Sequence, residues 1–135
     1  MKNEKIEDYL NKKMGSIPNY DEAVKSIKAM VKNAGVVNLD FYDVKTILDN
    51  AKEIRFFSGT DNNIAKISYP EADGALVSIE GPETMSLNEA RNIVKKIAEK
   101  INEEARIVWG AKINNKLKKT KFFVILVQNK QKRGY

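Results

Sequence analysis

A change of apolar period along the second half of the chain constrains the fold more than any other feature. Residues 75–79 and 122–127 are short apolar runs that are typical of buried strands. Between them, residues 87–102 repeat apolar side chains at spacings of three and four, which predicts an amphipathic helix. Ser86 and Glu89 form a capping-box sequence at its start. A helix between two strands implies a crossover connection within one sheet.

The rest of the chain follows simpler patterns. Asp21 is expected to cap a helix that Gly35 ends in the left-handed conformation. The lysine-rich turn at 114–121 predicts an antiparallel hairpin between the last two strands. We therefore expect an α+β fold, a small mixed β-sheet of about four strands with helices packed mainly on one face. The further elements expected are helices over 3–14, 21–33 and 41–50 and strands over 54–57, 64–69 and 105–113.

Composition narrows the function classes. With 135 residues, of which 42% are hydrophobic, the chain is long enough for one domain with a core. It has no cysteine and no histidine, which excludes disulfides, Cys/His metal sites and histidine-based catalysis. No apolar run is long enough for a transmembrane segment, and the first 20 residues are too polar for a signal peptide. We expect a cytoplasmic protein.

The net charge of +6 is concentrated at the C-terminal end. Residues 105–135 hold nine basic residues and no acidic one, so residues 1–104 have 15 basic residues against all 18 acidic ones. Such an end can bind nucleic acid or an anionic membrane, or it can be a solvated hairpin and tail. Aromatic residues do not alternate with the lysines, which favours the solvated reading. The candidate basic patch consists of Lys116, Lys118, Lys119, Lys121, Lys130, Lys132 and Arg133.

Enzyme motifs are missing from the sequence. The glycines form neither a P-loop nor a dinucleotide-binding fingerprint, so we predict no enzyme activity within this chain and no cofactor. The most suggestive polar group is Asn38, Asp40 and Asp43, between two predicted helices. Taken locally, Asp40 is an N-cap and Asp43 lies in the first helical turn, where the helix dipole favours an acid. That pair alone is a weak metal signal, and we predict no metal site.

Five segments, in order along the chain, resemble the tubulin-like cell-division family FtsZ. The segment GVVNLDFYDV at 35–44 looks like the family's synergy loop, with its pattern Asn-x-Asp-x-x-Asp. The segments at 73–81, 86–90, 105–113 and 122–127 are similar to successive elements of the family's C-terminal domain. No single segment is specific to the family, but the shared order of all five over most of the chain is specific to it.

The resemblance implies a domain organisation. Residues 1–20 would be an N-terminal helical extension, and residues 21–50 the end of the central helix, the synergy-type loop and the following helix. Residues 51–129 would be the FtsZ C-terminal-like α+β domain, followed by a basic tail at 130–135. The chain departs from the family in having no GTP-binding domain before the central helix. It also has only residues 61–73, without a helical pattern, where the family has a helix.

The resemblance also implies a function. In the family, the synergy loop of one subunit reaches the GTP bound by the next and helps to orient the attacking water. Asn38, Asp40 and Asp43 would then act only in trans, on a full-length FtsZ or another tubulin-like GTPase. We expect a protein that binds or caps the nucleotide-bearing end of such filaments. Two alternatives stay open: a truncated or split structural domain that needs a separate GTP-binding chain, and a basic module that binds nucleic acid or anionic membrane.

Overall fold

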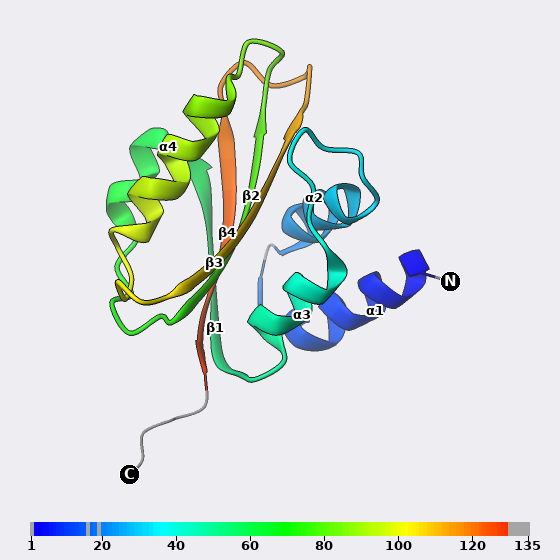
Figure 1. Ribbon diagram of the computed structural model, residues 1–135, viewed down its shortest axis with the longest axis vertical. Helices are drawn as coiled ribbons and strands as arrows, with labels where there is room; N and C mark the ends of the chain where they lie inside the picture. Colours follow the sequence, from blue (N-terminus) through cyan, green and yellow to red (C-terminus); the bar gives the residue numbers. More distant parts are fainter. Residues whose placement is uncertain (1, 16, 19, 130–135) are drawn as a thin grey trace.

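The chain folds around one mixed β-sheet with helices on both faces (Figure 1). The computed structural model describes residues 2–15, 17–18 and 20–129. Three helices cover one face of the sheet, and a fourth helix and a 3₁₀ helix cover the other. The elements are α1 (Lys2–Met14), α2 (Asp21–Val31), α3 (Phe41–Leu48), β1 (Ala51–Thr60), η1 (Asp61–Lys66), β2 (Gly74–Gly81), α4 (Leu87–Ala98), β3 (Arg106–Ile113) and β4 (Lys121–Asn129).

The sheet confirms the predicted α+β class and the crossover. Its strand order is β1-β4-β2-β3, with β4 antiparallel to both neighbours and β2 parallel to β3. The two central strands are buried on both faces, which explains why their sequences are unbroken apolar runs. Helix α4 provides the crossover between β2 and β3. Most helices lie on one face as expected, but α4 and η1 close the other face, so the sheet has two separate cores.

The predicted hairpin between the last two strands is wrong. Strand β2 lies between β3 and β4, so those two strands share no ladder of hydrogen bonds. The connecting residues 114–120 pass the end of β2, where the Asn114 amide donates to the Gly81 carbonyl at 2.7 Å. The lysine-rich connection is short enough for a hairpin turn. However, β2 occupies the position beside β4 that β3 would need, and β3 pairs with the other edge of β2 instead.

The predicted strand at 64–69 is also wrong. Residues 61–66 form the 3₁₀ helix η1, which occupies the place where the sequence showed no helical pattern. The Asn63 side chain accepts a hydrogen bond from the Thr60 amide at 2.8 Å and turns the chain as β1 ends. Ile64, Ile67 and Tyr69 are then buried beneath η1 and α4. The spacing of these side chains reflects a compact turn packed on the sheet instead of a strand within it.

The helix ends differ from the prediction in detail. Tyr20, and not Asp21, precedes the first residue of α2, and Asn33, and not Gly35, has the positive φ of 66° after that helix. Ser86 caps α4 as predicted by accepting from the Glu89 amide at 3.0 Å. The Glu89 side chain accepts from the Thr120 hydroxyl instead of completing the capping box. A tertiary contact has therefore replaced the local one.

Helix α1 is an integral part of the core. Ile6, Leu10 and Met14 are at most 1% exposed and pack against α2, α3 and the sheet. These side chains recur every four residues, which places them on one face of the helix. The predicted N-terminal helix therefore covers the apolar faces of α2 and α3.

Polar contacts surround the α1 interface. The Tyr9 hydroxyl donates to Asp49 at 2.5 Å, and its ring packs edge-on against Phe41 with centroids 5.7 Å apart. Burial, and then the Asp49 carboxylate, raise the pKa of Tyr9 well above its usual range, so the phenol stays a donor at neutral pH. Lys28 pairs with Glu7 at 2.7 Å. Helix α1 is thereby attached to both α2 and α3.

Replacing Leu10 tests the role of α1 in the core. Leu10→Ala should reduce the free energy of unfolding by about 2–5 kcal/mol, because Leu10 is completely buried and its loss leaves a cavity. Lys12→Ala on the exposed side of the same helix should change it by less than about 0.5 kcal/mol. Urea unfolding followed by circular dichroism measures both values. Equal, small effects of the two substitutions would mean that α1 is not packed as described.

Candidate functional site

The segment between α2 and α3 is anchored to the edge of the sheet. The amides of Val36 and Val37 donate to the Ala111 carbonyl at 2.8 and 3.1 Å, and the Ala111 amide donates back to Val37 at 2.9 Å. Leu39 is buried, and its amide donates to the Met30 carbonyl at 3.2 Å. These bonds attach the segment to β3 on one side and to α2 on the other. The loop that carries the candidate residues therefore has a defined position.

Asn38 holds the shape of this loop from within. Its Oδ1 accepts a hydrogen bond from the Gly35 amide at 2.7 Å. A Cβ atom at Gly35 would lie 2.6 Å from the Ala111 carbonyl oxygen, so only glycine permits the close approach to β3. Gly35 is thus needed for space and not for the left-handed cap that its position suggested.

Asp40 and Asp43 lie on the first turn of α3 and face different surroundings. Asp40 is exposed and accepts from the Tyr42 amide at 2.9 Å, which confirms it as the N-cap. An oxygen of Asp43 lies 3.7 Å from a guanidinium nitrogen of Arg106, at the start of β3. Both side chains of this pair are at least 40% exposed, so the pair adds little stability. The two carboxylates remain accessible to a partner.

Exposed apolar side chains occur on the loop, on α3 and at the start of α4. The large hydrophobic residues exposed among the described part of the chain are Val36, Tyr42 and Leu87, at 60%, 68% and 47%. Val36 and Leu87 line a groove of about 250 Å³ at the start of α4, together with Met85 and Ile113. Tyr42 lies between the two aspartates in sequence. Single exposed apolar side chains are common, but Val36 and Leu87 lie together in this groove, and grouped apolar side chains are typical of a contact surface.

The other predicted site residues do not converge on one surface. Lys116, Lys118 and Lys119 are exposed on the connection between β3 and β4, whereas Lys121 pairs with Glu22 at 3.2 Å. Residues Lys130, Lys132 and Arg133 lie outside the described part of the chain. In the ranges that the structure describes, no group of three or more acidic side chains could hold a metal ion. No helix in those ranges is long and apolar enough to cross a membrane.

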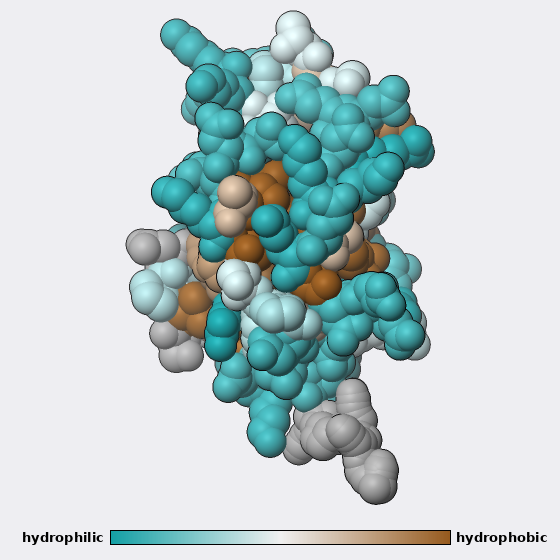
Figure 2. All heavy atoms as spheres, turned by 90° about the vertical axis from the view of Figure 1, so that its left-hand side faces the viewer, coloured by the Kyte–Doolittle hydropathy of each residue, from teal (hydrophilic) through white to brown (hydrophobic). Residues whose placement is uncertain are grey.

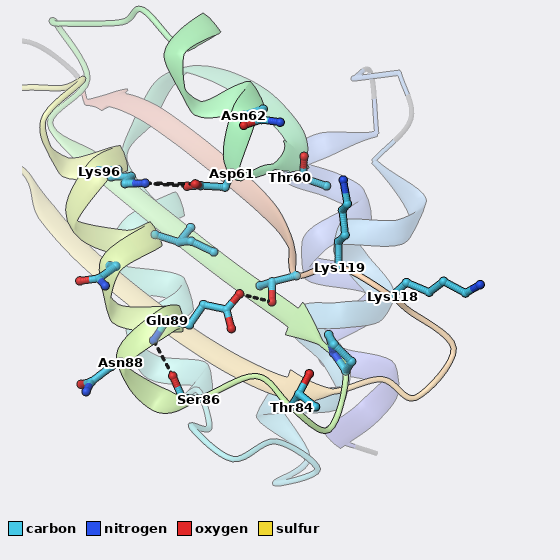
Figure 3. A pocket seen from close by; sticks show the side chains of 14 residues that line it. Thr60, Asp61, Asn62, Thr84, Ser86, Asn88, Glu89, Lys96, Lys118 and Lys119 are labelled. Atoms are coloured by element: carbon cyan, nitrogen blue, oxygen red, sulfur yellow. Dashed lines mark hydrogen bonds and ion pairs between the residues drawn. The ribbon is translucent and has the colours of Figure 1, made fainter.

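A polar pocket of about 620 Å³ lies on the α4 face and was missed by sequence reasoning (Figure 3). Helix α4 forms one wall, η1 the second, and the connection between β3 and β4 the third. Two side-chain contacts cross it, Lys96 to Asp61 at 2.9 Å and Thr120 to Glu89 at 2.8 Å. Glu89 and Lys96 lie seven residues apart on the polar side of α4, about two helical turns.

Comparison with known proteins identifies relatives of the whole fold. Residues 49–129 match the family model described as "FtsZ family, C-terminal domain". The chain is 27% identical to "Cell division protein FtsZ 1" of Methanocaldococcus jannaschii, over 82% of this chain and 35% of that protein. It is 32% identical to "Cell division protein FtsZ" of Methanothermobacter thermautotrophicus, over 70% of this chain and 29% of that protein. The chain thus spans about a third of the length of these curated relatives.

Solved structures agree with the sequence comparison. An empty FtsZ dimer from M. jannaschii superposes with a TM-score of 0.64 and 26% identity, covering 89% of this chain and 43% of that one. A W319Y mutant of the M. jannaschii protein gives a TM-score of 0.65 at 25% identity, over 89% of this chain and 45% of that chain. A CetZ from Methanosaeta thermophila, at 15% identity and a TM-score of 0.50, shares the fold alone.

Two substitutions at Asp40 separate its capping role from its charge. Asp40→Ala should lower the free energy of unfolding by about 1 kcal/mol, because the Tyr42 amide loses its acceptor. Asp40→Asn should leave stability within about 0.5 kcal/mol of wild type, since asparagine caps equally well. Urea unfolding measures both variants. If both lose the same stability, the contribution of Asp40 comes from its charge and not from the cap.

Proposed function

Because the chain belongs to the FtsZ family through its C-terminal domain, we propose that it docks on the nucleotide-bearing end of an FtsZ-type filament. The surface that docks is the loop of Asn38, Asp40 and Asp43 together with the exposed side chains beside it. The partner is a full-length FtsZ or another tubulin-like GTPase. The 135 residues supply one half of a composite site, and the partner supplies the nucleotide.

The observation that carries this proposal is the combination of a fixed loop with accessible carboxylates. Backbone bonds to Ala111 and Met30 hold the segment, so little conformational entropy is lost when it binds. Asp40 is exposed and Asp43 only weakly paired. Tyr42, between the two aspartates in sequence, and Val36, on the same loop, provide exposed apolar contact area. Apolar anchors beside accessible charges are typical of a protein interface.

The chemistry is that of positioning. The two carboxylates, on the first turn of one helix, would accept hydrogen bonds from a water molecule and orient it toward a phosphate held by the partner. Asn38 would act indirectly, because its side chain already accepts a hydrogen bond from the Gly35 amide and holds the loop in shape. It is therefore a positioning residue, whereas Asp40 and Asp43 would touch the water.

Docking at the nucleotide-bearing end of the last subunit would compete with the next subunit for that end. We propose that the chain caps the filament in this way. The described fold supports such a unit, since α1 covers the apolar faces of α2 and α3 and gives the domain a closed core. This packing favours docking over the alternative of a split domain that needs a second chain to complete its fold.

Mixing experiments with a full-length FtsZ, such as the M. jannaschii relative, test the proposal. The wild-type chain should lower the amount of polymer that pellets with GTP, because it blocks the growing end. The double variant Asp40→Asn and Asp43→Asn should still lower the amount of pelleted polymer, since it keeps the helix cap and the apolar anchors. It should change the rate of phosphate release, because both carboxylate charges are lost. Sedimentation and phosphate release are measured on the same samples.

Matched variants separate docking from catalysis. Tyr42→Ala with Val36→Ala should raise roughly tenfold the concentration of the chain that is needed to reduce the pelleted polymer, because two interface anchors are lost. Lys12→Ala, on the exposed side of α1, should behave as wild type. If the wild-type chain changes neither the pellet nor phosphate release at any ratio, it does not dock on FtsZ filaments.

A further inference from the structure

The polar pocket beside α4 has unused positive charge at its rim. Its acidic groups already have partners, because Asp61 binds Lys96 and Glu89 binds Thr120. Lys118 and Lys119 make no ion pair with any residue that the structure describes. In Figure 3, Lys118 extends outward from the connection between β3 and β4. The connection between β3 and β4 therefore carries two unpaired ammonium groups at the rim of the pocket, which is otherwise lined largely by amide and hydroxyl groups and by the paired Asp61, Lys96 and Glu89.

The lining of the pocket suits a peptide better than a metal or an apolar ligand. Asn88 and Asn92 line it from the start and middle of α4, and Thr84 lines it from the turn before that helix. Such side chains both donate and accept hydrogen bonds, as the backbone and carboxylates of a peptide require. The volume of about 620 Å³ is in the range of sites that hold small ligands or short turns.

An acidic turn of this chain has the complementary character. Asn102–Ala105 is a tight turn, in which the Asn102 side chain accepts from the Glu104 amide at 2.8 Å and the Ala105 amide donates to the Asn102 carbonyl at 3.0 Å. Glu103 and Glu104 lie at its tip, are exposed, and make no ion pair within the described residues. Glu99 lies beside them along the rim of a shallow hollow. The turn is preformed, so ordering it costs little on binding.

The pocket and the turn cannot meet within one molecule. The acidic turn precedes β3 and the lysine-rich connection follows it, so the eight residues of β3 separate them. At about 3.3 Å per residue this is roughly 26 Å, several times the Debye length of about 8 Å at physiological salt. Figure 1 shows the two segments at opposite ends of the sheet, yellow and orange. The two segments therefore cannot pair with each other inside one molecule.

We propose that the acidic turn of one copy enters the α4 pocket of a second copy, with Glu103 and Glu104 bound by Lys118 and Lys119. The contact is heterologous, since the two surfaces are different, and it repeats head to tail. It uses neither the loop of Asn38, Asp40 and Asp43 nor a nucleotide. The side of the molecule that carries α4 is mostly hydrophilic, with a few apolar areas (Figure 2), which is typical of a reversible, salt-dependent contact.

A charge-swap experiment tests this contact. The full chain should self-associate in sedimentation-velocity runs at low salt, and the apparent dissociation constant should rise at least about tenfold between 50 and 500 mM salt. Glu103→Lys with Glu104→Lys, or Lys118→Glu with Lys119→Glu, should each abolish association. Mixing the two reversed variants in equal amounts should restore head-to-tail association, because each retains one native surface and the two reversed surfaces match each other.

The controls distinguish this pairing from general charge effects. Lys25→Glu with Lys52→Glu, both exposed and outside the pocket, changes the net charge by the same amount as the Lys118 and Lys119 reversal and should leave association unchanged. Circular dichroism establishes that every variant is folded. A monomer at 50 mM salt and millimolar concentration overturns the proposal. So does association that survives either reversal, and so does failure of the mixed variants to pair. Binding of nucleic acid or anionic vesicles by Lys118 and Lys119 without self-association would assign the pocket to a different partner.

Discussion

The pairing of β2 with β4 is the contact on which the rest of the structure depends. Both strands are buried on both faces, so each face of the sheet must be covered by other elements. Helix α4 and η1 cover one side, and α1, α2 and α3 cover the other. Because β3 pairs with β2 and not with β4, one edge of the sheet belongs to β3. The loop after α2 attaches to that edge at Ala111, which fixes the position of the candidate site.

Helix α1 connects the N-terminal part of the chain to the same site. Tyr9 packs on Phe41, the first residue of α3, and donates to Asp49 just after that helix ends. Asp40 and Asp43 lie at the start of α3. The orientation of the two carboxylates therefore depends on α1 as well as on the sheet. The family model covers the sheet, at residues 49–129, and α1 supports the loop that precedes it.

The sequence predicted the elements with a strong local pattern. The amphipathic stripe of α4, the buried strand at 122–127 and the cap at Asp40 depend on neighbouring residues, and the structure confirms them. Strand order depends on distant pairing, which explains why the expected hairpin was wrong. Glu89 and Asn33 took roles set by tertiary contacts or backbone conformation, which local patterns do not encode. The pocket beside α4 has no sequence motif, because its walls come from three separate segments.

Site-specific crosslinking tests whether the Asn38–Asp43 loop contacts a nucleotide-bearing subunit. A photoreactive phenylalanine analogue at Tyr42, which is 68% exposed, should crosslink to a full-length FtsZ in the presence of a slowly hydrolysed GTP analogue. Mass spectrometry should place the crosslink beside the bound nucleotide, and the same analogue at Lys12 should give none. Equal crosslinking from both positions, or crosslinks confined to surfaces far from the nucleotide, would contradict the account.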